Sequence, residues 1–204
     1  MAAEDDCSGC CRSCMITAAF CLILAGFLCI VLGDRDPLYS AAIRSVSGLD
    51  EGDLGRRPAD LSPLFNVTLR VTTRSIFSSG CTHPGAVMEV TYAGVKLTTT
   101  AVQPFCARPR KAKDVAVEAW GMAVQVPGFA LDRLAADARR GLRVFDVDVT
   151  MPGNHQSRHH GKLVSCVGLH VGEDDGAALG APCTVSDVDT VMAVPSGKDG
   201  GGTS

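Results

Sequence analysis

The 204-residue chain has few aromatic residues and little net charge. Phe, Trp and Tyr make up 5% of it, with one Trp and two Tyr, and the formal net charge is −3. Proteins that bind nucleic acids usually combine a basic surface with aromatic side chains on which bases stack. The composition therefore argues against a nucleic-acid partner. Apolar residues are 46% of the chain, which excludes a wholly disordered protein.

The sequence also lacks the short motifs of the common enzyme classes. It contains no G-x-S-x-G, no Gly-rich phosphate loop, no H-E-x-x-H and no S-x-x-K. His155, His159 and His160 cluster in a polar segment bounded by Gly and Pro, which is more typical of an exposed hairpin tip than of a metal site. Asp146 and Asp148 alternate with apolar residues, as on the solvent face of a strand. We therefore predict no catalytic residue, no cofactor and no bound metal.

One long apolar segment stands out near the N-terminus. Residues 15–33, MITAAFCLILAGFLCIVLG, contain no charged side chain. A helix of this length is about 28 Å long, close to the thickness of the bilayer hydrocarbon. We predict a single transmembrane helix over 15–33, which contacts the lipid bilayer. The alternative is a signal peptide cleaved after Gly33, although the apolar run is long and the leader acidic for that role.

The ten cysteines fall into three groups, with four before this segment, Cys21 and Cys29 within it, and four after it. Residues 1–14 form a leader that holds Cys7, Cys10, Cys11 and Cys14. Two adjoining C-x-x-C pairs leave no chain to fold around a zinc ion, so we predict S-acylation of this leader in the cytosol.

Features after the apolar segment indicate an oxidising compartment. Cys81, Cys106, Cys166 and Cys183 could form one or two disulfides, with three connectivities open. Asn66-Val-Thr68 is a sequon for N-glycosylation at Asn66. Together with the leader, these features predict a cytosolic N-terminus and a larger part that faces outward.

The outward-facing part reads as a linker followed by strands. Residues 34–60 are rich in Gly, Ser, Asp, Arg and Pro and show no period, which predicts a linker. Apolar residues then alternate with polar ones over 64–72, 88–98, 115–119 and 145–149, with a tight turn at Ala93-Gly94 and an apolar run over 163–171. Residues 127–141 instead show helical spacing and end at Gly141. The pattern predicts a mainly β fold, an antiparallel β-sandwich of the immunoglobulin or fibronectin kind over 61–185, with one short helix.

The C-terminal stretch and the charges complete this organisation. Residues 186–204 read as a flexible, acidic, Gly-rich tail, although residues 182–185 could add an edge strand. Residues 34–172 carry 17 Lys and Arg against 13 Asp and Glu, whereas residues 173–204 carry 1 against 6. A basic group follows Cys106 and consists of Arg108, Arg110, Lys111 and Lys113. It is either a solvated loop or a contact for anionic lipid headgroups or cell-wall polyanions.

Taken in order, these segments resemble a plant family, the late embryogenesis abundant (LEA) subgroup 2 proteins, also called harpin-induced-like proteins. The matching segments are residues 64–71, 90–97, 102–106, 145–149 and the strand that ends near Cys166. Where that family commonly has an Asn-Pro-Asn-like segment after the first strand, this chain has Thr72-Thr-Arg-Ser75. Its four outward-facing cysteines indicate a disulfide-stapled branch.

The resemblance implies a single-pass protein of the plasma membrane that acts in stress and defence responses without a catalytic site. We therefore expect an extracellular β-sandwich that serves as an interaction module for an unknown protein or cell-wall partner. Two alternatives are a secreted β-sandwich binder or hydrolase released after Gly33, and a sandwich that holds a lipid between its sheets.

Overall fold

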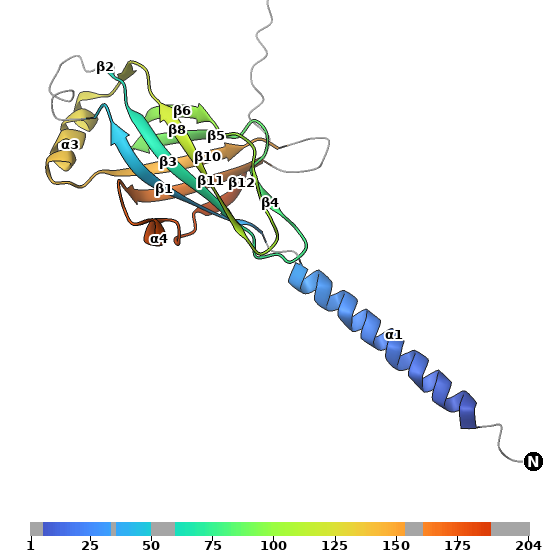
Figure 1. Cartoon of the computed structure of the whole chain (residues 1–204). Helices are drawn as coiled ribbons and strands as arrows, with labels where there is room; N and C mark the ends of the chain where they lie inside the picture. The colour runs from blue at the N-terminus through green and yellow to red at the C-terminus, as the bar shows by residue number, and fades with distance from the viewer. Residues whose placement is uncertain (1–5, 34–35, 50–59, 154–160, 189–204) are drawn as a thin grey trace, which may run out of the picture. The chain divides into compact units, whose positions relative to one another are not determined.

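The computed structural model describes residues 6–33, 36–49, 60–153 and 161–188, and within the first helix it describes the side chains of residues 14–28. The helices are α1 (Asp6–Gly33), α3 (Gly128–Arg139) and α4 (Asp175–Ala178). The strands are β1 (Leu38–Ser47), β2 (Asp60–Leu61), β3 (Leu64–Thr72), β4 (Gly80–Cys81), β5 (Val87–Tyr92), β6 (Val95–Ala101), β7 (Cys106–Ala107), β8 (Ala112–Trp120), β9 (Val124–Gln125), β10 (Val144–Met151), β11 (Gly161–His170) and β12 (Thr184–Val188) (Figure 1). The predicted mainly β chain with antiparallel sheets is confirmed.

The chain divides into two compact units. The first unit consists of residues 1–38, 71–81 and 106–113. The second unit consists of residues 39–70, 82–105 and 114–204.

The second unit holds most of the regular structure. Its larger sheet has five strands in the order β12-β11-β10-β5-β6, and the three-stranded sheet β1-β3-β8 belongs to this unit except at the strand ends (Figure 1). A further pair, β2-β9, joins Asp60 to Gln125 and Leu61 to Val124.

The core of the second unit is shared by its two sheets. Phe65 of β3 meets Phe145 of β10 edge to face with 5.1 Å between the ring centroids, and Tyr92 of β5 lies 5.8 Å from the Phe145 ring. Along β3, Phe65, Val67 and Leu69 are buried as the sequence predicts, and the polar Thr68 is buried as well. Aromatic pairs of this geometry add to the stability that area burial already gives.

The hairpin over β5 and β6 forms as predicted. Tyr92 pairs with Val95, so that Ala93 and Gly94 are the two turn residues. Their φ angles are 48° and 79°. Positive φ at both positions is the two-residue turn that matches the twist of a hairpin.

Helix α3 confirms the predicted helix over 127–141. Its buried face consists of Ala130, Leu131 and Leu134, and Gly141 follows the helix with a φ of 71°. A left-handed residue just past the helix end favours glycine because it has no Cβ.

The predicted linker over 34–60 is wrong for part of its length. Residues Leu38–Ser47 form β1, in which residues 39–43 are all buried. The period-2 signal is missing here because both sides of this strand are covered, so no polar residue alternates with the apolar ones. Small residues such as Ala41 and Ala42 also give a weak hydrophobic signal, so the sequence does not indicate that this segment is buried. Residues 50–59 lie outside the described residues.

The predicted boundaries at the C-terminal end also need correction. Strand β12 runs to Val188 and pairs with β11, so the edge strand forms and residues 186–188 are not part of a flexible tail. The short helix α4 makes the predicted count of one short helix wrong. The rest of the predicted tail, 189–204, lies outside the described residues.

Helix α1 contains the apolar segment singled out from the sequence. Its described side chains, residues 14–28, are all exposed. Within the described stretches, we find no helix whose length and hydropathy together meet what a membrane crossing requires.

Candidate functional site

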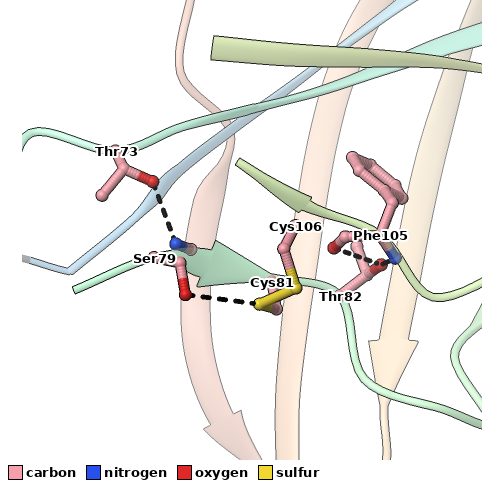
Figure 2. The surroundings of a disulfide bond; sticks show 7 residues. Thr73, Ser79, Cys81, Thr82, Phe105 and Cys106 are labelled. Carbon is pink, nitrogen blue, oxygen red and sulfur yellow. Dashed lines mark hydrogen bonds between the residues drawn. A yellow bond between two sulfur atoms is a disulfide. The ribbon is translucent and has the colours of Figure 1, made fainter. Parts of the chain in front are cut away.

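A disulfide joins two distant segments of the first unit. Cys81 of β4 is bonded to Cys106 of β7, and the same strands pair Gly80 with Ala107 (Figure 2). The backbone N–H of Gly80 also donates to Oγ1 of Thr73 at 3.0 Å. Figure 2 shows these contacts around the two cysteines. The bond closes a loop over a sequence separation of 25 residues and fixes the segment after Cys106 beside the segment before Cys81.

Backbone hydrogen bonds extend this connection. The N–H of Thr73 donates to the carbonyl of Lys111 at 3.0 Å, and the N–H of Arg110 donates to the carbonyl of Ser75 at 3.1 Å. Arg110 itself has a φ of 56° in a turn that the N–H of Lys111 closes onto the carbonyl of Arg108 at 3.0 Å. The segments 73–79 and 108–111 therefore lie side by side.

The buried Ser75 shapes the tip of the first segment. Its Oγ accepts hydrogen bonds from the N–H groups of Phe77 at 3.2 Å and Ser78 at 3.0 Å. A hydroxyl that caps the backbone two and three residues on is a common turn device. The turn leaves Phe77 66% exposed and Ile76 39% exposed.

The two chain segments that meet at this apolar tip are basic. The residues 71–81 and 106–113 contain no Asp or Glu and five Lys or Arg, all with exposed side chains: Arg74, Arg108, Arg110, Lys111 and Lys113. We call these five residues together with Ile76 and Phe77 the loop surface. The loop surface includes the four basic residues that the sequence analysis singled out, Arg108, Arg110, Lys111 and Lys113. They are close in the chain, and the turn closed by Lys111 and Arg108 holds them together.

Arg74, Ile76 and Phe77 were missed by sequence reasoning. They are about thirty residues away from the basic group in the chain, and the disulfide, the β4–β7 pairing and two backbone hydrogen bonds bring the two segments close. The available signal was Ile76-Phe77, an apolar pair set among Ser residues where no strand period continues.

The second disulfide lies in the second unit. Cys166 of β11 is bonded to Cys183, just before β12. Of the three connectivities left open by the sequence, the structure thus has Cys81–Cys106 and Cys166–Cys183. The segment before Cys183 follows the edge of β1, since the N–H of Gly172 donates to the carbonyl of Ile43 at 2.9 Å and the N–H of Cys183 to that of Tyr39 at 2.8 Å. A covered edge is not available for pairing with another chain.

Asn66 lies on β3, in the middle of the three-stranded sheet. Its side chain is half-buried, and its Nδ2 lies 3.5 Å from Oγ of Ser45 as a hydrogen-bond donor. Thr68, the third sequon residue, is buried and accepts a hydrogen bond from Nε of Arg44 at 3.1 Å. N-glycosylation of Asn66 stays a prediction, and the structure places it on the polar face of this sheet rather than in a loop.

The leader cysteines are only partly described. Cys14 and Cys21 are exposed free cysteines on α1. The side chains of Cys7, Cys10 and Cys11 lie outside the described ones, so S-acylation of the four stays a prediction.

A shallow hollow in the second unit is a further candidate. It has a volume of about 220 Å³ and is lined by Lys96, Leu97, Thr98, Thr99, Trp120, Gly121, Met122 and Val124. Trp120 is 62% exposed there. Among the described residues, the buried hydroxyl of Thr98 is a side-chain group without a hydrogen-bond partner. The hollow is smaller than the about 300–1,000 Å³ usual for small-molecule sites.

Tyr92 is a buried titratable group with a structural role. Its Oη donates to Oδ2 of Asp137 at 2.6 Å, which ties β5 to α3. Burial of the phenol, followed by the hydrogen bond and the charge of Asp137, raises the pKa of Tyr92 to about 12. This contact stabilises the neutral phenol and does not prepare it for catalysis.

Clusters of metal-ligating side chains are absent from the described part of the chain. No group of three or more His, Cys, Asp or Glu there could hold a metal ion. The sulfur of Cys81 is in a disulfide, so Cys81 is not a free thiol. Asp146 uses Oδ1 to accept the N–H of Gly168 at 2.8 Å. His155, His159 and His160 lie outside the described residues.

No family model matches the chain, and no curated protein matches it either. One similar solved structure is described as the crystal structure of a protein from Archaeoglobus fulgidus. It is 10% identical, with a TM-score of 0.30, and the match covers 74% of this chain and 91% of that one. A similarity at this level supports no conclusion on fold or function.

Proposed function

We propose that the chain is a single-pass membrane protein, anchored through α1, that presents its β-rich part outside the cytosol as a non-catalytic interaction module. On this proposal it is a plasma-membrane protein like the LEA subgroup 2 proteins that its sequence resembles, and it serves stress and defence responses. Its partner is a protein or a cell-wall component.

The observation that carries the proposal is the uncovered apolar surface of α1. Met15, Ile16, Phe20, Leu22 and Ile23 are each more than 60% exposed. In water, such a surface costs about 25 cal/mol for each Å² that stays uncovered. The proposed span over 15–33 continues past Leu28, the last described side chain of the helix. A lipid bilayer is the cover that suits a helix apolar on all sides.

The state of the cysteines supports the proposed orientation. Two disulfides lie after the helix, whereas Cys14 and Cys21 on the helix are free. Disulfides persist in oxidising compartments, and thiols stay reduced in the cytosol. A cytosolic N-terminus is consistent with a free Cys14 before the proposed span and two disulfides after it.

We also propose that the two sheets of the second unit are the layers of a β-sandwich. The support is their shared core, where Phe65 and Phe145 meet at 5.1 Å across the sheets. A sandwich keeps the polar face of β3, with Asn66 and Arg70, available to solvent and partners.

The proposal is tested with the full chain carrying a C-terminal epitope in plant cells. We expect the protein to stay in the membrane pellet after alkaline carbonate extraction, and protease added to intact cells to remove the epitope. The matched variant Leu22→Arg/Ile23→Arg should be extracted into the supernatant, since each Arg in a span costs about 2.5–3.5 kcal/mol. If the wild-type protein were extracted, the anchor would be wrong. If protease removed the epitope only after permeabilisation, the orientation would be wrong.

A further inference from the structure

We propose that the loop surface rests on the phosphate-bearing headgroups of the bilayer that α1 enters, with Phe77 inserted at the interface. This inference rests on the proposed anchor and names a partner for the outward-facing part. The occupant is a phospholipid surface, and four features of the loop surface support it: its distance from α1, its charge, its apolar tip and its rigidity.

The chain itself limits how far the loop surface can be from the end of α1. Gly33 ends the helix, and Pro37 follows four residues later, so about 14 Å of extended chain separates them at most. Pro37 lies directly against Gly80, because a Cβ added to Gly80 would fall 2.6 Å from Cβ of Pro37. Gly80 is three residues from Phe77 and next to Cys81. A membrane-inserted α1 therefore keeps the loop surface near the headgroups.

The charge of the loop surface is complementary to phosphate. Its two chain segments carry five cations and no acidic residue. The nearby Asp114 does not offset them fully, because both its carboxylate oxygens lie 2.7 Å from guanidinium nitrogens of Arg70. Lys and Arg donate charge-assisted hydrogen bonds to phosphate oxygens, and phospholipid headgroups carry such oxygens in either leaflet.

The apolar tip favours a bilayer over a polysaccharide. Phe77 and Ile76 are exposed, and they directly follow Ser75, whose carbonyl accepts the N–H of Arg110. A polyanionic polysaccharide offers carboxylates to the cations but has no hydrocarbon layer into which the ring could insert. A membrane interface can bind both kinds of side chain. Its phosphate groups contact the cations, and the aromatic ring packs at the boundary of the hydrocarbon region.

The loop surface is also held in one shape before any contact. The Cys81–Cys106 disulfide, the Thr73–Lys111 and Arg110–Ser75 hydrogen bonds and the Ser75 turn keep the cations beside the tip. A preorganised surface loses less conformational entropy on binding than a mobile loop would.

The test places a tryptophan at the tip of the full-length protein in nanodiscs. In a Trp120→Phe background, Phe77→Trp supplies a single fluorophore, which we call the tip probe. The matched control is Phe129→Trp in the same background, the helix probe, because Phe129 of α3 is similarly exposed at 72%. The nanodiscs contain phosphatidylcholine with or without phosphatidylglycerol, and brominated acyl chains serve as quenchers.

We expect bromolipid to quench the tip probe and shift its emission to the blue, more strongly with phosphatidylglycerol, while the helix probe is quenched less. The charge variant R108E/R110E/K111E should abolish the quenching of the tip probe. An unchanged circular dichroism spectrum and urea midpoint show that this variant is folded, and resistance of Cys81 and Cys106 to alkylation without reductant shows that it keeps the disulfide.

The outcomes separate the two proposals. If the protein did not co-elute with nanodiscs, the anchor itself would be wrong. If it co-eluted but the tip probe was quenched no more than the helix probe, the headgroup contact would be wrong. The contact would also be overturned if the tip probe stayed unquenched while the charge variant lost binding to polygalacturonate, because the loop surface would then be a polysaccharide site.

Discussion

The first and second units hold their strands together in different ways. The second unit packs two sheets over a core that includes Phe65, Met88, Leu97 and Phe145, all nearly inaccessible to solvent. Outside α1, the described part of the first unit consists of the ends of β1, β3 and β8, the two-residue strands β4 and β7, and loops joined by one disulfide and a few hydrogen bonds. Short segments bury too little apolar area to be stable by packing alone. The disulfide therefore contributes a larger share of the stability of this unit.

The difference is consistent with the roles proposed for the two units. A large core gives the second unit a rigid body on which surface residues can be presented. The first unit instead exposes Ile76 and Phe77 among five cations, which is unfavourable in water and useful at a membrane surface.

The largest expected effect tests the core of the second unit. Phe145→Ala removes the ring that contacts both Phe65 and Tyr92, and it should lower the free energy of unfolding by about 3–5 kcal/mol. Urea denaturation followed by circular dichroism measures this change. The control Phe129→Ala, at a site 72% exposed, should change it by less than about 0.5 kcal/mol. Similar losses in both variants would contradict the assigned core.

The next effect tests the dependence of the first unit on its disulfide. Cys81→Ala/Cys106→Ala opens a loop spanning a separation of 25 residues, for which the chain-entropy relation gives about 3.5 kcal/mol. We expect fast amide hydrogen exchange at residues 73–80 and 107–111, with β5 and β10 still protected. The matched variant Cys166→Ala/Cys183→Ala should instead speed exchange at β12 and at residues 172–183. Global loss of protection in the first variant would show that the two units are not independent.

A smaller effect tests the close packing at Gly80. A Cβ there would lie 2.6 Å from Cβ of Pro37 and 2.8 Å from Oγ1 of Thr73. Gly80→Ala should therefore cost about 1–3 kcal/mol, again by urea denaturation. Gly128→Ala is the control, because nothing lies within 4 Å of the added Cβ, and it should be neutral or slightly stabilising. A neutral Gly80→Ala would mean that Pro37 does not lie against Gly80.

The smallest expected effect concerns Tyr92. Tyr92→Phe keeps the ring contact with Phe145 and loses the hydrogen bond to the half-buried Asp137, at about 1 kcal/mol. The pKa of Tyr92 is raised from 10.0 to about 12, so its contribution to stability is complete below pH 10 and is lost as the pH rises toward 12. The chain has two Tyr, and ultraviolet titration should show a phenol step near pH 12 that Tyr92→Phe abolishes. Persistence of that step in the variant would contradict the assignment.

The sequence predicts the elements whose burial is one-sided. Strand β3 alternates buried and polar residues, the hairpin carries Ala93-Gly94 at its turn, and α3 repeats Leu131 and Leu134 at helical spacing. Each signal is local, so it can be recognised without the rest of the chain. Strand β1 is different, because neighbouring elements cover it on both sides and its small residues show no period.

The candidate site was predictable only in part. The run from Arg108 to Lys113 is visible as a basic group, and Cys106 marks its start. The pairing of Cys106 with Cys81 is not local information, and neither are the hydrogen bonds that bring the segment 73–79 beside Arg110. Contacts between residues this far apart depend on the whole fold, which a period or a motif does not encode.

The central claim is that α1 stays attached to the β-rich part as a membrane anchor. Intact-mass measurement with N-terminal sequencing of the mature protein, purified from detergent-solubilised plant membranes, tests it most directly. The account predicts that residues 15–33 are retained, with added acyl mass on the leader cysteines. A mature chain that begins at Asp34 would contradict it, because the protein would then be secreted without the helix.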